Sequence, residues 1–375
     1  MGIIPNLNII VLIFLFLSTL TLSSLFNSNT DKNKVITMSG GSRSIYKVIN
    51  AIQQPEGVGA TVRRSIGIMS NRKFNPFLLF DHFASSGVDG FPEHPHRGQE
   101  TITYVMNGGI AHEDFTGSKG ILYKGDLQFM TAGKGIVHSE MPIPSEDGSP
   151  SVGMQLWVDL PEPLKDSAPR YRDLRAWEIP EVHEQDDKLV VKVISGKSYG
   201  VESLKDLAYT PVNYYHYIMK PGSNFKQDFE PDYNVFLYVL KGNSLVLTGT
   251  NEKVKQYQNV LFNTDGGFVG GEVSADSNDE VEFILVGGKQ LNQNVVQYGP
   301  FVATSQEKIQ QAFLDYNYAR NGFDNIKNWR TLISNGVTKE MINGPLQGSL
   351  EHREELKKAY LENLKNQKVP AKDEL

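Results

Sequence analysis

Two pairs of potential metal ligands constrain the fold of this chain more than any other feature of its 375 residues. The pairs are His94-x-His96 and His138-x-Glu140. Alternate residues of a β-strand point to the same face, so each pair presents two donor groups to one side of its strand. If the two strands face each other inside a small barrel, three imidazoles and one carboxylate converge on one point.

Such a donor set suits a divalent transition metal, because imidazole binds iron, copper, nickel and zinc. Four protein ligands leave two open positions on a six-coordinate metal, where O₂ or a substrate can bind. An isolated pair of this kind is weak evidence, since polar residues on an exposed strand face give the same letters. Two pairs in a chain with only 8 histidines, each beside a turn rich in glycine or proline, favour a metal site.

Short β-type segments separated by Gly, Pro, Asn and Asp run through residues 41–165 and return in residues 189–298. This spacing is typical of sandwiches and barrels. We therefore predict an all-β dominated fold of two tandem β-barrels, with C-terminal helices over residues 305–320 and 349–366. The only histidine of the second stretch is His216, so we expect that barrel to be structural or to form one wall of a cleft.

The residues around the two pairs resemble signatures of the pirin family, whose members are two-domain proteins of the cupin superfamily. The runs that carry the resemblance include FNPFLLFDHF, GFPEHPHRGQETITYVMNGGIAHEDF, GDLQFMTAGKGIVHSEMP and GMQLWVDLP. It covers roughly residues 41–335 and is looser in the second half, through VISGKSYG and GPFVATSQEKIQQAFLDYNYARNGF. It implies a bicupin: an N-terminal metal-binding cupin domain (41–165), an interdomain linker (166–188), a degenerate C-terminal cupin domain (189–335) and a helical tail (336–375).

The resemblance also implies a cofactor and an activity. In pirins the positions matching His94, His96, His138 and Glu140 bind iron, which implies Fe²⁺ here; the spacing alone is compatible with other first-row divalent metals. Pirins are similar to flavonol-cleaving cupins, which implies a dioxygenase using O₂ on a quercetin-like flavonol or a related enolisable phenol. Glu140 would be both a ligand and the catalytic base.

A second reading stays open, because pirins are also described as iron-redox-sensitive regulators of transcription factors. In that case the chain would be a metal-dependent, redox-sensing binding protein without turnover.

Several further polar residues fall in or near the pirin-like runs. We expect Glu100 to support the ligands from behind or to act as an alternative ligand. We expect Arg97 to make a local ion pair rather than to steer an anionic substrate. For the others we expect structural roles (His82 and His112), a place in a cavity lining (Gln99 and Gln155) and surface positions (His183 and His352).

Composition excludes several classes of site. The chain has no cysteine, which excludes disulfides, thiol nucleophiles and thiolate metal ligands. Its formal net charge of -6 gives no electrostatic footprint for nucleic acid. The charge therefore predicts no nucleic-acid partner. The resemblance implies a small phenolic substrate and O₂ as partners, and we expect a monomer.

The two ends carry targeting information. Residues 9–17 are apolar without interruption, but a membrane span needs about 20 such residues. We predict a signal peptide over residues 1–28, followed by a linker (29–40), with a signal anchor as the alternative because no basic residue precedes the apolar run. The last residues, KDEL (372–375), match the endoplasmic-reticulum retention signal. We expect a protein of the reticulum lumen bound by the KDEL receptor, with secretion or membrane anchoring as alternatives.

Overall fold

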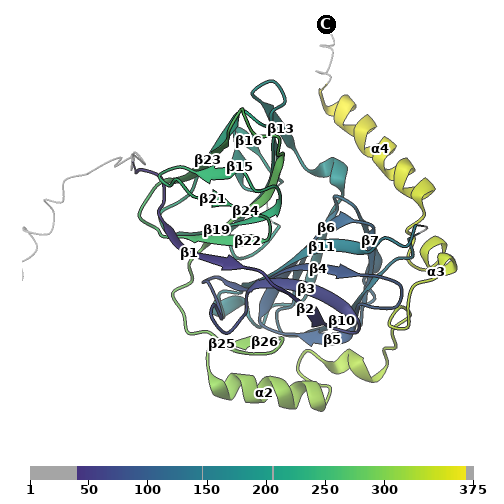
Figure 1. The fold of residues 1–375 in the computed structure, drawn as a ribbon. Coiled ribbons are helices and arrows are strands. Elements are labelled where there is room, and N and C mark those ends of the chain that lie inside the picture. Colours follow the sequence, from purple (N-terminus) through teal and green to yellow (C-terminus); the bar gives the residue numbers. More distant parts are fainter. Residues whose placement is uncertain (1–39, 146, 205–206, 369–375) are drawn as a thin grey trace, which may run out of the picture. The chain divides into compact units, whose positions relative to one another are not determined.

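Antiparallel strands make up most of the structure, a computed structural model that describes residues 40–145, 147–204 and 207–368. The predicted fold of two tandem barrels with a few C-terminal helices is confirmed (Figure 1). The predicted signal peptide, nearly all of the linker at 29–40 and the KDEL residues lie outside the described residues. None of the described helices is long and apolar enough to cross a membrane.

The first barrel pairs a seven-stranded sheet with a four-stranded sheet. In spatial order the larger sheet contains β12 (Arg170–Leu174), β9 (Leu127–Thr131), β6 (Gln99–Asn107), β11 (Ser151–Asp159), β4 (Phe77–Ser85), β3 (Ala60–Ile66) and β2 (Gln53–Glu56). The smaller sheet contains β5 (Phe91–His96), β10 (Ile136–Pro142), β7 (Gly109–Asp114) and β8 (Lys119–Tyr123). Both candidate ligand pairs therefore lie on neighbouring strands of the smaller sheet.

The second barrel repeats this plan. Its seven-stranded sheet contains β1 (Ile45–Asn50), β22 (Gln258–Phe262), β19 (Tyr233–Lys241), β24 (Val281–Lys289), β17 (Val212–Met219), β14 (Leu189–Ser195) and β13 (Glu181–Glu184). Its four-stranded sheet contains β18 (Ser223–Asp228), β23 (Phe268–Val273), β20 (Leu245–Leu247) and β21 (Lys253–Val254). Two short hairpins complete the strands: β15 (Lys197–Ser198) with β16 (Val201–Glu202), and β25 (Val296–Tyr298) with β26 (Phe301–Ala303).

Side chains alternate along each strand, so that one set points into the interior of its barrel and the other into a core between the two barrels. On β6, Ile102 and Tyr104 face outward, whereas Thr103 points into the first barrel. The outer faces of the two seven-stranded sheets pack on each other, so that Ile102 shares one apolar cluster with Phe236 and Ile284 of the second barrel. The barrels are thus joined by a continuous apolar core, and their interiors stay distinct.

Two predicted domain boundaries do not follow the sheets. Strand β1 belongs to the predicted first domain (41–165), yet it pairs with β22 of the second barrel, with Val48 opposite Val260. The predicted linker at 166–188 contains β12, which pairs with β9, and β13, which pairs with β14. The structure therefore corrects both boundaries. They could not be predicted, because these pairings depend on long-range register that local sequence does not encode.

After β24 the chain returns to the first barrel. Helix α2 (Gln306–Asn317) begins at Ser305, whose hydroxyl accepts a hydrogen bond from the backbone N–H of Lys308. It buries Ile309 in a cluster with Ile136 of β10. The other helices are α3 (Lys339–Asn343), α4 (Leu350–Lys368) and the short turns η1 (Glu162–Leu164), η2 (Ala176–Glu178) and η3 (Asp324–Lys327). Helices were predicted close to α2 and α4, but the end of the predicted second domain (189–335) covers the first barrel.

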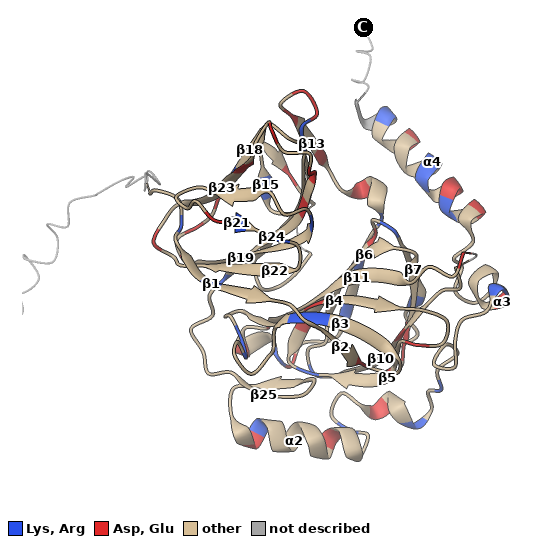
Figure 2. Ribbon diagram, in the orientation of Figure 1, with Lys and Arg blue, Asp and Glu red and all other residues tan. Residues whose placement is uncertain are grey.

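Helix α4 carries acidic and basic side chains along its length (Figure 2). The guanidinium of Arg353 bonds both carboxylate oxygens of the fully buried Asp126 at 2.6 Å and lies over the rings of Tyr123 and Trp177. The first turn of α4 is therefore docked on the first barrel.

Candidate metal centre

Strands β5 and β10 bring the predicted histidines together. Their register sets His94 opposite His138, and His96 follows two residues further along β5. Glu140 follows His138 by two residues, after a bulge that shifts β10 against β5. Strand β5 is an edge strand and contains Pro92 and Pro95, which an edge tolerates because proline has no N–H to donate.

The geometry of the three histidines fits one metal ion. Their donor atoms all lie within 4.8 Å of one another. The Nε2 atoms of His94 and His138 are 3.0 Å apart, and the ring of His96 lies 5.0 Å from each of the other two rings. Two imidazole nitrogens bound at right angles to one ion, at about 2.1 Å, lie about 3.0 Å apart. The spacing is therefore that of neighbouring ligands of a first-row metal.

Burial keeps two of these histidines in the neutral form. His96 and His138 are almost completely buried, and burial lowers the pKa of each well below its usual value. A neutral imidazole is the form that binds a metal. Nε2 of His96 and Nδ1 of His138 have no hydrogen-bond partner among the described residues. A buried nitrogen without a partner costs free energy, and a metal ion would satisfy the one on His96.

Partners behind the rings direct the Nε2 atoms inward. Nδ1 of His94 lies 2.7 Å from the carbonyl oxygen of Pro92, so it carries the proton and donates it. Nδ1 of His96 lies 2.7 Å from the amide nitrogen Nε2 of Gln99, and the amide oxygen of Gln99 has no hydrogen-bond partner among the described residues. With that oxygen turned toward His96, the Nδ1–H would be held and Nε2 left free. Such partners orient ligand histidines in metal sites generally.

Glu140 lies beside the three histidines but outside the group that they form. Its carboxylate is 3.9 Å from Nε2 of His138 and accepts hydrogen bonds from Thr103 Oγ1 and Gln155 Nε2, both at 3.2 Å. Burial raises the pKa of Glu140, and the neighbouring His94 partly offsets this increase. The structure brings together the three predicted histidines, and the ligand role of Glu140 stays a prediction.

Glu100 does not support the metal site, which corrects the expectation from its spacing. Strand β5 ends at His96, and a turn at Gly98 with a φ of 75° resets the alternation before β6. Glu100 therefore faces the interface between the barrels. There its carboxylate accepts hydrogen bonds from the backbone N–H groups of Tyr209 and Thr210, both at 3.0 Å.

The remaining residues singled out from the sequence occupy varied places. Arg97 makes the expected ion pair, at 2.9 Å from Asp315. His82 lies in the interface between the barrels, where burial lowers its pKa to about 4. His112 is inside the first barrel, opposite Glu140 across the strand pair. His183 and His352 lie on the surface, Gln155 lies on the cavity wall, and Gln99 lies behind His96. His216 lies at the interface, between Tyr104 and Glu282.

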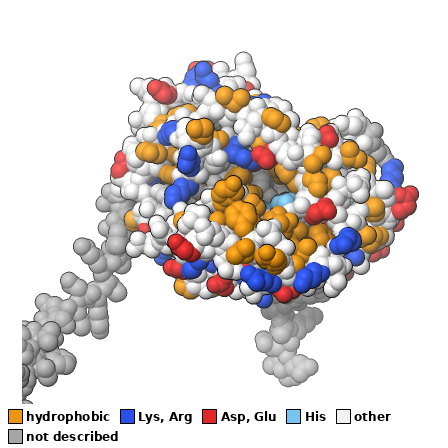
Figure 3. Space-filling view, turned by 90° about the horizontal axis from the view of Figure 1, so that it is seen from below, with side chains coloured by type: hydrophobic (Ala, Val, Ile, Leu, Met, Phe, Trp, Pro, Cys, Tyr) orange, Lys and Arg blue, Asp and Glu red, His pale blue; other side chains and the backbone are white. Residues whose placement is uncertain are grey.

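A cavity of about 1150 Å³ leads from the surface to His94 and Glu140. The space-filling view shows apolar side chains gathered around this hollow, with a histidine visible inside it (Figure 3). Arg64 on the wall is neutralised by Asp81 and Glu56, each at 2.7 Å. Much of the remaining wall is apolar and includes Ile68, Leu79, Phe83, Phe91, Ile110 and Trp157.

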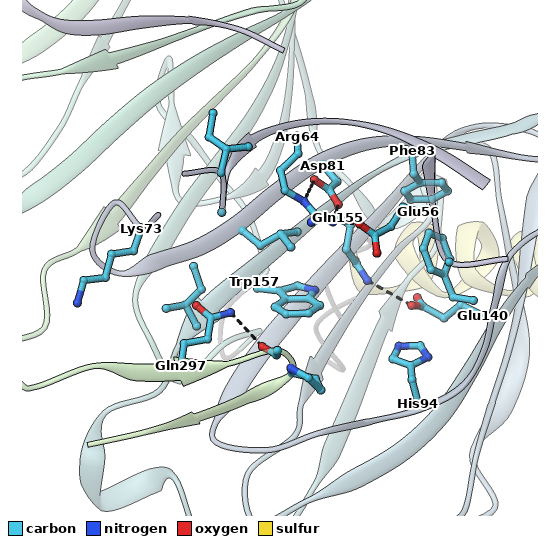
Figure 4. Close-up of a pocket in the computed structure, with 18 of the residues that line it drawn as sticks. Glu56, Arg64, Lys73, Asp81, Phe83, His94, Glu140, Gln155, Trp157 and Gln297 are labelled. Carbon is cyan, nitrogen blue, oxygen red and sulfur yellow. Dashed lines mark hydrogen bonds and ion pairs between the residues drawn. The ribbon is translucent and has the colours of Figure 1, made fainter. Parts of the chain in front are cut away.

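Trp157 is a site residue that sequence reasoning missed. It lies on β11 with Gln155, and both point toward the cavity near Glu140 and His94 (Figure 4). Its ring lies 4.9 Å from that of His96, edge to face, and its Nε1 has no hydrogen-bond partner among the described residues. The strand pattern of GMQLWVDLP already sets Gln155 and Trp157 on one face, opposite the interface residue Leu156.

Comparisons with known proteins agree with this architecture. The family model described as Pirin matches residues 59–158, and the one described as Pirin C-terminal cupin domain matches residues 214–322. The chain is 39% identical to Pirin from Homo sapiens over 300 residues, which is 79% of this chain and 100% of that protein. It is 38% identical to Pirin-like protein 2 from Arabidopsis thaliana over 295 residues, covering 77% of this chain and 89% of that one.

Among solved structures, Quercetin 2,3-dioxygenase from Acinetobacter baumannii superposes with a TM-score of 0.68 and 26% identity. The match covers 74% of this chain and 98% of that one. With both family models matched in order and human Pirin aligned over its whole length, this chain belongs to the pirin family of the cupin superfamily.

Proposed function

We propose that this chain is a metal-dependent dioxygenase that uses O₂ to cleave a flavonol or a related enolisable phenol, with Fe²⁺ as its metal. One observation carries the proposal: three convergent histidines lie at the end of a largely apolar cavity, and the buried Nε2 of His96 has no hydrogen-bond partner in the described part of the chain. The likeness to an enzyme named as a quercetin 2,3-dioxygenase supports the choice of substrate class.

The first task of the chain is to hold the metal and leave room beside it. His94, His96 and His138 would hold the ion. The carboxylate of Glu140, now 3.9 Å from Nε2 of His138, would become a fourth ligand after a small movement. A bound ferrous ion supplies Lewis acidity toward a phenolate oxygen and one-electron chemistry toward O₂. The other steps depend on residues of the chain.

The second task is to take a proton from the substrate. Flavonols must lose a hydroxyl proton before their ring becomes electron-rich enough to react with O₂. Burial raises the pKa of Glu140, which brings it closer to that of a phenol and makes proton transfer to its carboxylate less unfavourable. Thr103 and Gln155 donate hydrogen bonds that keep this carboxylate facing the cavity.

The third task is to bind a flat aromatic molecule away from water. The cavity is large enough for a three-ring flavonol, since ligand sites for molecules of that size are typically about 300–1,000 Å³. Phe83, Phe91 and Trp157 line it and offer aromatic surface for ring contacts. An apolar wall also keeps bulk water from reactive intermediates.

The test measures turnover. The protein is loaded with Fe²⁺ under anaerobic conditions, and O₂ is then admitted together with the substrate. Quercetin is the first probe, followed by other flavonols and enolisable phenols, with O₂ consumption and ring cleavage as readouts. We expect O₂ uptake that depends on both metal and flavonol, and none with metal-free protein. A chain that is fully loaded with iron and consumes no O₂ with any of these probes would contradict the proposal and favour a redox-sensing binding protein without turnover.

A further inference from the structure

The strand that carries His94 and His96 is held from outside the barrel by the C-terminal part of the chain. We call residues 300–334 the C-terminal brace. The backbone N–H of Arg97 donates to Pro300 O at 3.2 Å, and the N–H of Val302 donates to Arg97 O at 3.0 Å. These bonds occupy the otherwise free edge of the chain immediately after His96, since β5 is paired only with β10 in its own sheet.

The side chain of Arg97 extends this attachment into α2 and the turn after it. Its Nη1 donates to Asp315 at 2.9 Å, its Nε donates to Lys134 O at 2.7 Å, and its Nη2 donates to Asn321 O. The guanidinium also lies 4.7 Å from the ring centre of Phe323. Asp315 is only 2% exposed, so this ion pair is well shielded from solvent and is worth more than a surface pair.

The other end of β5 is held in the same way. The backbone N–H of Glu93, next to His94, donates to Ser334 Oγ at 3.2 Å, and that hydroxyl also bonds the Glu93 carboxylate. Ser334 Oγ lies 2.9 Å from the hydroxyl of Ser139, which stands between His138 and Glu140 on β10. The brace therefore contacts the outer face of both strands whose inner face carries the candidate ligands.

Strand β5 has little support within its own sheet. It has six residues and pairs with β10 alone, and its two prolines have no backbone N–H with which to bond a further partner. The matching edge strand of the second barrel, β18, contains no proline, and its outward residues Asn224, Lys226 and Asp228 are exposed to solvent. In place of a brace, the free edge of β18 is bonded by two side chains: Gln185 at the backbone of Asn224 and Tyr199 at the N–H of Lys226.

We propose that the C-terminal brace positions the metal ligands, and that Arg97 and Ser334 are positioning residues for His94 and His96. This inference rests on the proposed metal centre but not on dioxygenase turnover. Loosening either end of β5 would let the imidazoles depart from the arrangement in which their Nε2 atoms converge. Groups that orient metal ligands from behind typically contribute 10–100-fold to metal affinity, so we expect a loss of about that size.

The experiment compares Arg97→Met and Ser334→Ala with a matched control, Arg43→Met. Arg43 is 2% exposed and holds the second barrel much as Arg97 holds the first. Its guanidinium donates to the carbonyl oxygens of Gly266, Glu230 and Tyr233 and lies 5.8 Å from the ring centre of Phe229. Thermal unfolding of metal-free protein reports the stability of each variant. Co²⁺ titration against a competing chelator gives affinity, and the visible d–d absorption of bound Co²⁺ reports ligand geometry.

We expect Arg97→Met to raise the Co²⁺ dissociation constant about 10–100-fold and to change the d–d spectrum, with a smaller change in the same direction for Ser334→Ala. Arg97→Lys, which keeps the charge beside Asp315, should recover part of the affinity. Arg43→Met should lower stability and leave affinity and spectrum as in the unmodified chain.

Unaltered Co²⁺ affinity and spectrum in the two brace variants would overturn the inference. If Arg97→Met does not fold, Ser334→Ala decides alone. An unmodified chain that binds no Co²⁺ would reject the metal centre and this inference with it. An unmodified chain that binds metal but does not turn over would reject only the dioxygenase proposal.

Discussion

The two barrels share the order of all strands but the one beyond β9 and β22 (β12 in the first, β1 in the second), and they differ in what fills them. In the first, His94 faces His138 across β5 and β10; in the second, Phe225 faces Gly271 across the corresponding strands β18 and β23. The buried side chains of β18 and β23 are Ser223, Phe225, Gln227, Val269 and Val273, so these two strands offer neither a histidine nor a carboxylate to the interior.

The second barrel is filled where the first is hollow. The ring centres of Tyr217 and Phe225 are 5.1 Å apart, and each lies 4.9 Å from the ring centre of Phe283. The hydroxyl of Tyr217 donates to the side-chain oxygen of Gln227 at 2.9 Å, which satisfies this buried polar group. The same fold can therefore hold a metal site or a packed interior, and a metal site needs both histidines and an interior left empty beside them.

The largest expected effect is the loss of the metal in His96→Ala. Removing a ligand from the first barrel should abolish metal retention and turnover while the fold persists, because the apolar core between the barrels and the core of the second barrel contain no ligand residue. Metal analysis, circular dichroism and O₂ uptake check this, with the exposed His183→Ala as control. A variant that stays loaded and active would remove the basis of the comparison, and one that unfolds would indicate a structural metal.

The next effect concerns Glu140, for which the buried residues of β18 and β23 offer no acidic counterpart. Glu140→Gln should lower the turnover number about 10²–10⁴-fold, the usual contribution of a general base. Metal affinity should fall far less, because three histidines remain. The measurement pairs steady-state O₂ uptake with metal titration. Equal losses of affinity and turnover would mean that Glu140 acts only as a ligand.

As the pH falls, we expect the first barrel to lose stability at a higher pH than the second. Burial lowers the pKa of His82 to about 4 in the folded protein, against an ordinary value of 6.5, and it also lowers those of His96 and His138. Between these pH values the unfolded chain binds the proton and the folded chain does not. Stability is therefore complete above pH 6.5 and falls as the pH approaches 4.

For His82 this loss amounts to about 3 kcal/mol, from about 1.4 kcal/mol per unit of pKa. Hydrogen exchange of metal-free protein at several pH values should show amides of β4 losing protection before those of β22 and β23. Loss of protection in the second barrel first would contradict this order.

The smallest expected effect tests the filled barrel. A Cβ added at Gly271 would lie 2.8 Å from Val246 O and 3.0 Å from the ring of Phe225. Gly271→His should therefore destabilise the protein by about 1–3 kcal/mol, as overpacking does, and should create no second metal site. Urea unfolding and metal stoichiometry test this. A stable variant that binds a second ion would show that the histidines alone make the difference between the barrels.

Much of the fold and the three histidines could be predicted from the sequence, because both depend on local patterns. Alternation along a strand placed His94 with His96, and His138 with Glu140, on common faces. The same rule failed for Glu100, because the turn at Gly98 interrupts the strand.

Long-range pairing could not be predicted in this way. Nothing near β1 in the sequence indicates that it joins β22 of the second barrel. In the same way, nothing near Ser334 indicates that it holds β5. The predictions about the signal peptide, the KDEL signal and the lumen of the reticulum remain predictions.

The most direct test of the account is anomalous diffraction from crystals of the chain loaded with Fe²⁺ or Ni²⁺, with data collected at the absorption edge of the metal. The account predicts one anomalous peak per chain, about 2.0–2.2 Å from Nε2 of His94, His96 and His138, and none inside the second barrel. Its distance from Glu140 would settle whether the carboxylate is the fourth ligand. A fully loaded chain whose only peak lies away from these histidines would contradict the central claim.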